Sequence, residues 1–351
     1  MATTEYDSIL LVSFGGPEGP DEVMPFLENV VRGKPVPRER LLEVAEHYKH
    51  FGGVSPINEQ NRELLSALRT ELDSHGISLP LYWGNRNWKP FLTDALEEMK
   101  RDGRKRALAF FTSMFSCYSG CRQYRENIAA AQESVGPGAP SIDKLRMGFN
   151  HPLFISAVVD QTRQALELFA ESERQGVELV FTAHSIPLGM SQNSSYELQL
   201  NESARLVTKA LEREDYTLCY QSRSGPPSQP WLEPDVLDVL NSLAEKGKKC
   251  VLISPLGFVS DHMEVMQDLD IECFEEAQEL GMKLLRANTV GTHPHFVQMI
   301  RELIVERIEG SPQKAALGNL GAWHDVCPVD CCRYERPSRP ASSVLRETHS
   351  S

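Results

Sequence analysis

The chain has 351 residues, and its 49 acidic and 36 basic side chains give a formal net charge of −13. This charge argues against a nucleic-acid partner, because binding to a phosphate backbone needs a basic face. Hydrophobic residues make up 41% of the chain. The longest apolar runs, such as 107–111, are far shorter than the roughly 20 residues of a membrane helix, so we expect no integral membrane segment.

Short apolar runs, each followed by a helix-length segment, alternate along almost the whole chain. The runs predict strands at 8–14, 79–84, 106–113, 145–149, 177–184, 217–222, 249–255 and 283–287. Apolar residues at helical spacing are clearest at 61–74 and 153–171. This alternation predicts an α/β fold in which parallel sheets are covered by helices.

The length of the chain exceeds that of an ordinary single core, so two domains are expected. Four predicted strands come before Asn150 and four after it, which favours two facing Rossmann-like domains at 1–145 and 146–310. A Gly- and Pro-rich stretch at 134–141 is the predicted hinge between them. Beyond these domains lies a cysteine-containing tail, 311–351. The N-terminus lacks the basic segment of a signal peptide, which predicts a cytoplasmic protein.

The strand predicted at 177–184 ends at His184, and the strand predicted at 249–255 leads through a loop to Asp261 and Glu264. Ligands of open α/β sheets bind beyond the carboxyl ends of the strands, so these loops predict a cleft for a broad ligand. An imidazole and a carboxylate at neighbouring strand ends can move protons or hold a divalent metal. A structural alternative makes Asp261 the N-cap of a helix and Glu264 the acidic residue of a capping box.

Five motifs follow one another along the chain. They are Leu-Leu-Val-Ser-Phe-Gly-Gly-Pro at 10–17, His-Phe-Gly-Gly-Val-Ser-Pro-Ile-Asn at 50–58, Phe-Thr-Ala-His-Ser-Ile-Pro at 181–187, Gln-Ser-Arg-Ser-Gly-Pro-Pro at 221–227 and Gly-Phe-Val-Ser-Asp-His-Met-Glu at 257–264. In this order they resemble the ferrochelatases, over roughly 8–308. The resemblance implies a chelatase-type fold and a lyase that inserts Fe²⁺ into a porphyrin.

The resemblance also implies catalytic roles for His184 and Glu264, which would lie on opposite sides of the porphyrin. Both are expected to contact the Fe²⁺ substrate and to take part in removing pyrrole protons. The chemistry agrees, because two N–H protons must leave the macrocycle while the metal enters. Which residue takes the first proton stays open.

Four further residues are implied to bind the substrate. Ser55 and Tyr124 are expected to contact the porphyrin, and Arg32 is a candidate partner for a propionate. Phe14 occupies a position where many relatives carry tyrosine. A phenyl ring cannot ligate iron in the bound product, so product release or metal access is expected to differ in this chain.

The most similar branch uses coproporphyrin III, to judge from the starting motif at 14–20, the segment 121–126 and the absence of an apolar lip. This implies formation of coprohaem in haem biosynthesis by a monomer, with other haem-pathway enzymes as candidate partners. The alternatives are a protoporphyrin ferrochelatase, a cobalt or nickel chelatase for another tetrapyrrole, and a non-catalytic porphyrin carrier.

Eight cysteines in a cytoplasmic chain favour metal or redox chemistry over disulfides. Cys121, Cys327, Cys331 and Cys332 resemble the one internal and three C-terminal cysteines of several ferrochelatases, and four thiolates can hold a [2Fe–2S] cluster. A zinc site or reduced cysteines in a disordered tail are the alternatives. Cys117 could substitute for one ligand. The remaining cysteines are predicted to be core residues, at Cys219, Cys250 and Cys273.

Overall fold

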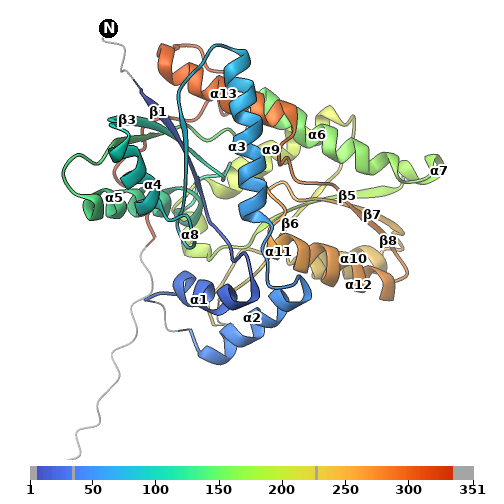
Figure 1. Ribbon diagram of the computed structural model, residues 1–351. Helices are drawn as coiled ribbons and strands as arrows, with labels where there is room; N and C mark the ends of the chain where they lie inside the picture. Colours follow the sequence, from blue (N-terminus) through green and yellow to red (C-terminus); the bar gives the residue numbers. More distant parts are fainter. Residues whose placement is uncertain (1–5, 34–35, 226–227, 335–351) are drawn as a thin grey trace, which may run out of the picture.

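The structure, a computed structural model, describes residues 6–33, 36–225 and 228–334, and within them the strands form two parallel sheets (Figure 1). The first sheet has the order β2-β1-β3-β4, with β1 Ser8–Ser13, β2 Leu81–Asn85, β3 Arg106–Phe111 and β4 Ser141–Lys144. The second repeats it as β6-β5-β7-β8, with β5 Val177–His184, β6 Thr217–Gln221, β7 Cys250–Ser254 and β8 Lys283–Arg286. The predicted α/β fold with two parallel sheets is therefore confirmed.

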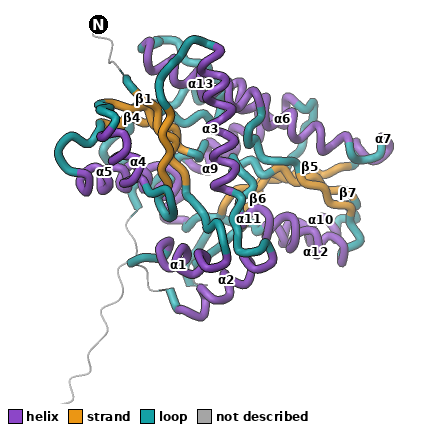
Figure 2. Tube along the Cα trace, in the orientation of Figure 1, coloured by secondary structure: helices purple, strands orange, loops and turns teal. Residues whose placement is uncertain are grey.

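Helices cover the faces of both sheets (Figure 2). The α-helices of the first half are α1 Pro20–Val30, α2 Arg38–His50, α3 Ile57–Ser74, α4 Leu92–Arg101 and α5 Gln123–Val135. Those that follow are α6 Pro152–Glu167, α7 Glu171–Arg174, α8 Leu188–Gln192, α9 Tyr196–Ala210, α10 Val236–Glu245, α11 Met263–Val265, α12 Cys273–Glu279 and α13 Pro294–Glu309. Two π-helical segments, η1 Tyr118–Arg122 and η2 Met266–Glu272, interrupt this pattern.

The central strands are continuous apolar runs because helices cover both of their faces. All six residues of β1 are buried, and so are all five of β7. In α3, Leu64, Leu68 and Leu72 of the predicted stripe are buried in the core, and Leu65 is partly buried against it. These burial patterns are what made the strands and helices recognisable in the sequence.

The fourth strand of the first sheet lies before the predicted one. The sequence predicts a strand at 145–149, whereas β4 is Ser141–Lys144 and pairs with β3. The alternating apolar residues Leu145, Met147 and Phe149 are buried, but they follow the strand. Beyond Leu145 the chain leaves the sheet, and Gly148 lies against Met299 of α13, so their apolar pattern reflects packing of a connecting segment.

The predicted hinge at 134–141 is also wrong. This segment joins α5 to β4, and both belong to the first half of the chain. The chain passes from the first sheet to the second between the end of β4 and the start of α6. Turn-forming residues marked a loop correctly, but they carry no information on which elements the loop joins.

Helix α13 packs against elements of both halves. Phe296 on this helix makes edge or tilted ring contacts with Phe110 of β3 at 6.0 Å and with Phe154 of α6 at 6.3 Å. On the same helix Glu306 accepts two hydrogen bonds from Arg146, at 2.8 and 2.9 Å, and Arg301 donates to Glu71 of α3 at 2.7 Å. One continuous hydrophobic core therefore includes residues from both sheets.

No helix among the described residues is both long and apolar enough to span a membrane.

Candidate active site

His184 is the last residue of β5, beside the point where the strand order of the second sheet reverses. Its Nδ1 lies 2.5 Å from the carbonyl oxygen of Ser185. Because a carbonyl can only accept, the proton is on Nδ1 and the neutral ring keeps a free lone pair on Nε2. Tyr196 donates a hydrogen bond to the carbonyl of His184 at 3.0 Å and so holds the backbone of this residue. The site thus presents Nε2 as a base or a metal ligand.

The carboxylate of Glu264 lies 3.5 Å from Nε2 of His184. Glu264 is the second residue of α11, directly after the cap His262 and Met263. Its position at the start of a helical stretch favours a negative charge, because the first backbone N–H groups carry partial positive charge. The structure therefore brings together the two residues for which the sequence predicts a catalytic role. The expectation that they lie on opposite sides of the porphyrin is wrong, because a separation of 3.5 Å leaves no room for a macrocycle between them.

The predicted capping arrangement is wrong. The N-cap of α11 is His262, whose Nδ1 accepts a hydrogen bond from the backbone N–H of Val265 at 3.3 Å. Asp261 instead accepts hydrogen bonds from Arg286 at 2.8 Å and from Thr289 at 3.1 Å. The reason is electrostatic, since the Arg286 guanidinium offers the Asp261 carboxylate a partner of opposite charge.

The charges of the two histidines and Glu264 are coupled. Desolvation by the surrounding protein opposes ionisation of Glu264, although 52% of its side chain is exposed. The charge of His184, its hydrogen bond to Glu264 and the charge of His262 together outweigh this effect, and the pKa of Glu264 falls to about 2. Burial lowers the pKa of His184, but the charge of Glu264, together with the hydrogen bonds to Glu264 and to the carbonyl of Ser185, raises the pKa above its usual value. Burial lowers the pKa of His262, whose Nε2 is 3.8 Å from the Glu264 carboxylate, and here Glu264 does not offset it. A proton entering this group is therefore held first by His184.

Asp268 is a site residue that the sequence analysis does not identify. It lies in the π-helical segment η2, which continues directly from α11. Its carboxylate accepts hydrogen bonds from Gln221 at 3.1 Å and from Ser222, a residue with a positive φ of 61°. Burial raises the pKa of Asp268 to about 7, with a further contribution from the charge of Glu264. In the sequence, the one indication of a role for Asp268 was its position four residues after Glu264.

Elements of the first half of the chain contact the loop that carries Glu264. The side chain of Gln60 on α3 accepts from the backbone N–H of Asp261 at 2.9 Å and donates to its carbonyl at 3.2 Å. Met263 packs in a small core with Phe26 and Tyr48, from α1 and α2. Burial raises the pKa of Tyr48, and the charge of Glu264 adds to the effect. The site is therefore built from both halves.

Two of the predicted substrate-binding residues share one contact in the first half. The guanidinium of Arg86 lies 5.5 Å from the ring centroid of Phe14 and 4.9 Å from that of Tyr124. Phe14 is half-buried after β1, and Tyr124 is buried in α5, stacked on Phe111 at 5.2 Å. Arg86 follows β2, so these side chains gather beyond the carboxyl edge of the first sheet. Arg86 was visible in the sequence only as part of a polar loop.

The other two predicted substrate-binding residues differ in their exposure to solvent. Ser55 is buried, and a side chain on Gly16 would come within 2.6 Å of it, so the loop after β1 packs directly against Ser55. Arg32 follows the last turn of α1, and its side chain is exposed. The structure gives Arg32 freedom to reach a ligand but no fixed position.

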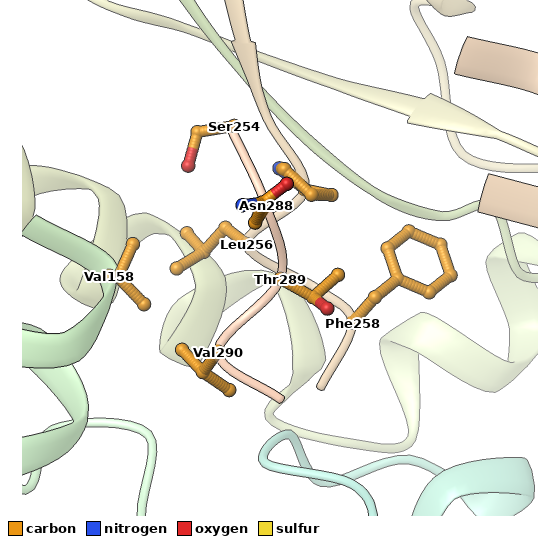
Figure 3. A pocket seen from close by; sticks show the side chains of 8 residues that line it. Val158, Ser254, Leu256, Phe258, Asn288, Thr289 and Val290 are labelled. Carbon is orange, nitrogen blue, oxygen red and sulfur yellow. The ribbon is translucent and has the colours of Figure 1, made fainter. Parts of the chain in front are cut away.

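A small cavity lies next to the loops that follow β7 and β8 (Figure 3). Its lining comes from α6 and these two loops and includes Val158, Ser254, Leu256, Phe258 and Thr289. The volume of about 10 Å³ is close to that needed for a single water molecule. This cavity is too small for a macrocycle, so we do not assign the substrate to it.

The four cysteines of the predicted ligand set gather in one place. Cys121 is buried in η1, and the described part of the tail brings Cys327, Cys331 and Cys332 to it. The sulfur atoms of Cys331 and Cys332 are 3.5 Å apart. Arg122 donates hydrogen bonds to the carbonyls of residues 329 and 331 at 3.1 Å each, which fixes the tail against η1.

One of these sulfurs is set up as a thiolate. A hydrogen bond from the Cys121 thiol lowers the pKa of Cys327 to about 4, and the nearby charges of Lys144 and Arg125 add to this effect. The pKa of Cys121 is raised correspondingly, first by its hydrogen bond with Cys327 and then by burial. Lys144 is itself buried. A buried cation beside a cluster of sulfurs favours bound anionic ligands.

His324 joins this cluster and was missed from the sequence. Ligand atoms of His324, Cys327 and Cys331 lie within 4.8 Å of one another. The spacing of three and four residues between them resembles that of metal-binding segments and was the available signal. Cys117, the alternative ligand, caps η1, and its sulfur accepts a hydrogen bond from the N–H of Gly120 at 3.2 Å.

The other three cysteines are buried in regular elements, as predicted. They are Cys219 in β6, Cys250 in β7 and Cys273 in α12. All eight cysteines of the chain are free in the structure.

The fold resembles that of solved chelatases. SirB from Bacillus subtilis with Fe³⁺ superimposes with a TM-score of 0.53 at 14% identity, covering 88% of this chain and 98% of that one. The sirohydrochlorin chelatase SirB from Bacillus subtilis subspecies spizizenii, in complex with cobalt, gives a TM-score of 0.51 at 12% identity, covering 87% and 97%. At this level of identity the likeness describes the fold alone.

Sequence relatives extend over nearly the whole chain. The family model for ferrochelatase matches residues 6–308. A ferrochelatase of Rhodopirellula baltica is 62% identical over 336 residues, which cover 95% of each chain. A coproporphyrin III ferrochelatase of Streptomyces griseus is 49% identical over an alignment of 360 positions, gaps included, that covers 96% of each chain.

Two parallel sheets of the same strand order, with a histidine and a carboxylate paired where the order reverses, define a chelatase-type α/β fold. The matched residues and the relatives then fix the family. The chain belongs to the ferrochelatases, lyases that insert iron into a porphyrin.

Proposed function

We propose that this protein inserts Fe²⁺ into coproporphyrin III to give coprohaem. The observation that carries the proposal is the distance of 3.5 Å between Nε2 of His184 and the carboxylate of Glu264. Relatives named coproporphyrin III ferrochelatase, 49% identical over nearly the full chain, support the choice of porphyrin.

The reaction releases two pyrrole protons for each Fe²⁺ that enters the macrocycle. His184, with its proton fixed on Nδ1, accepts the two protons in turn at Nε2 and releases the first before it takes the second. Glu264 then stabilises the imidazolium that forms, because its carboxylate stays ionised. Asp268, with its pKa near neutrality, is suited to pass protons from the site to solvent. His184 and Glu264 are also the residues that we expect the iron substrate to contact.

Substrate binding is assigned to the carboxyl edge of the first sheet. Phe14 and Tyr124 are proposed to contact the macrocycle at the surface that they form with Arg86. Ser55 is proposed to contact it where the loop after β1 packs against this residue. An exposed arginine such as Arg32 is suited to a propionate, since guanidinium and carboxylate form paired hydrogen bonds. The phenyl ring of Phe14 offers the product no oxygen ligand.

The proposal is tested by anaerobic metal insertion with coproporphyrin III and protoporphyrin IX. We expect kcat/KM with Fe²⁺ to be more than about tenfold higher for coproporphyrin III, because a site built for four carboxylates loses paired contacts with a substrate that has two. A preference for protoporphyrin, a faster reaction with Co²⁺ or Ni²⁺, or porphyrin binding without turnover would each support one of the alternatives.

We further propose that Cys121, Cys327, Cys331 and Cys332 hold a [2Fe–2S] cluster. The residues fit this group, since four sulfur donors gather beside buried Lys144, which offsets the negative charge of thiolate ligands. When bound, the cluster would supply one-electron redox chemistry and clamp the tail to η1. A zinc site that includes His324 is the alternative supported by the positions of these side chains.

Replacing any one of the four cysteines by alanine is expected to remove the visible absorption bands together with bound iron and sulfide. It should also lower the midpoint of thermal unfolding, because a tail without its clamp loses its attachment. Cys117→Ser is the matched control, since a serine oxygen can accept the same Gly120 hydrogen bond. A colourless protein that contains zinc, and loses it in His324→Ala, would contradict the cluster. Loss of the cluster in Cys117→Ser would contradict this ligand set.

Several expectations stay predictions. They are the division at residues 145 and 310, a monomeric state, a cytoplasmic location and contacts with other haem-pathway enzymes. Residues 335–351 of the proposed tail and residues 226–227 of one family motif lie outside the described residues.

A further inference from the structure

A second group of metal-ligating side chains lies on elements that the proposed reaction does not use. Asp160 comes from α6, and His293 and His295 come from the start of α13. All three side chains are partly exposed, at 31%, 12% and 40% respectively. An ion could therefore reach them from solvent without a change in the fold.

The distances in this group suit a tetrahedral ion. The Oδ2 atom of Asp160 is 3.6 Å from Nε2 of His293 and 3.5 Å from Nδ1 of His295. All three ligand atoms lie within 4.8 Å of one another. Zinc bonds of about 2.0–2.2 Å in a tetrahedron separate neighbouring ligand atoms by about 3.4 Å. The ligand atoms of the two histidines lie within the same 4.8 Å, and the fourth position is left for water.

The donor types select the kind of metal. Two imidazoles and one carboxylate suit zinc and its neighbours in the first transition series, whereas Mg²⁺ and Ca²⁺ prefer sites made of oxygen. We propose that Asp160, His293 and His295 bind a divalent transition-metal ion, Zn²⁺ rather than Mg²⁺ or Ca²⁺, at a site separate from the His184–Glu264 pair.

The partial positive charge at the start of α13 opposes an added cation, and the carboxylate of Asp160 offsets it. Arg163 occupies the other oxygen of Asp160 at 3.3 Å and leaves Oδ2 to the histidines.

Metal binding must replace two hydrogen bonds. Nδ1 of His293 accepts the backbone N–H of His295 at 3.2 Å, which places the proton of the neutral ring on Nε2. A metal on Nε2 requires this proton to move to Nδ1, at the cost of that capping bond. Nδ1 of His295 lies 2.9 Å from the hydroxyl of Ser156, which an ion would displace. Ser156→Ala should therefore leave metal affinity unchanged or raise it.

The site is linked to the loop before Glu264 by the segment that precedes α13. Thr289 donates to Asp261 at 3.1 Å, and the N–H of Gly291 donates to the carbonyl of Val259 at 2.9 Å. An ion that joins His293 to Asp160 would hold the end of this segment to α6. The ion would thus steady the connection without touching the candidate active site.

The test measures Zn²⁺ binding to the full chain by equilibrium dialysis in a His184→Ala background, which removes one competing ligand. We expect Asp160→Asn and His295→Gln each to weaken one Zn²⁺ equivalent by more than about tenfold and to abolish the rise of the thermal midpoint with Zn²⁺. The matched control is His75→Gln, because His75 also lies beside a carboxylate, that of Glu71 at 3.5 Å, but has no third ligand in the described residues.

Neither Asp160→Asn nor His295→Gln removes the cap of α13, so their thermal midpoints without metal report whether the fold is kept. Unchanged Zn²⁺ binding in both variants would overturn the proposal. So would a thermal midpoint that rises equally with Mg²⁺ or that responds to zinc as strongly in the two variants as in the parent.

Discussion

Replacement of His184 by alanine is expected to lower kcat for iron insertion by on the order of 10³-fold, the scale of a lost general base. The substitution removes the imidazole whose Nε2 lies 3.5 Å from the Glu264 carboxylate. Strand β5, which ends at His184, stays paired with β6 and β7. Porphyrin binding, followed by fluorescence quenching, should change little. Anaerobic stopped-flow insertion of Fe²⁺ gives the rate.

His50→Ala, at the exposed end of α2, serves as the control for removal of a histidine elsewhere and should keep the parent rate. Iron insertion by His184→Ala at close to the parent rate would remove the basis for assigning the active site. A loss of porphyrin binding of the same size as the loss of rate would show a binding role instead of a chemical one.

Glu264→Gln is expected to lower kcat by on the order of 10²-fold, because the amide keeps the size of the side chain but loses the charge that stabilises a protonated His184. The same change shifts a titration. Glu264 raises the pKa of His184 in the parent, so removing its charge should lower that pKa. Since neutral His184 is the active form, the acidic limb of the rate profile should move to lower pH.

The pKa of His184 can be followed directly by NMR of its imidazole in the metal-free protein. Glu275→Gln, in the exposed part of α12, is the control and should leave the titration unchanged. A Glu264→Gln protein with the parent rate would reduce this carboxylate to a structural role. A His184 pKa that rises in the variant would contradict the proposed pairing.

The fold was largely predictable because its central strands are buried on both faces. A continuous apolar run of five residues such as 250–254 is typical of a strand that is buried on both faces. The prediction failed where apolar residues pack outside a sheet, as Leu145, Met147 and Phe149 do. Alternation of buried and exposed side chains indicates contact with a core, and it does not report whether the backbone is paired with another strand.

The candidate site was predictable where one residue ends a strand, as His184 does, and where a family motif marked Glu264. Asp268 was missed because its environment comes from Gln221 and Ser222, which follow another strand. His324 was missed because only the folded tail brings it to the cysteines. Roles of this kind depend on contacts between segments distant in the chain, which spacing within one segment does not report.

Helix α13 joins both halves of the molecule, yet it is the last long helix of the described chain. On the ribosome, both sheets are therefore made before the element that packs between them. Until residues 294–309 emerge, the apolar surfaces of α3 and α6 that this helix covers stay open to water. Completion of the core thus waits until this helix has left the ribosome, and the unfinished chain exposes apolar surface of the kind that chaperones bind.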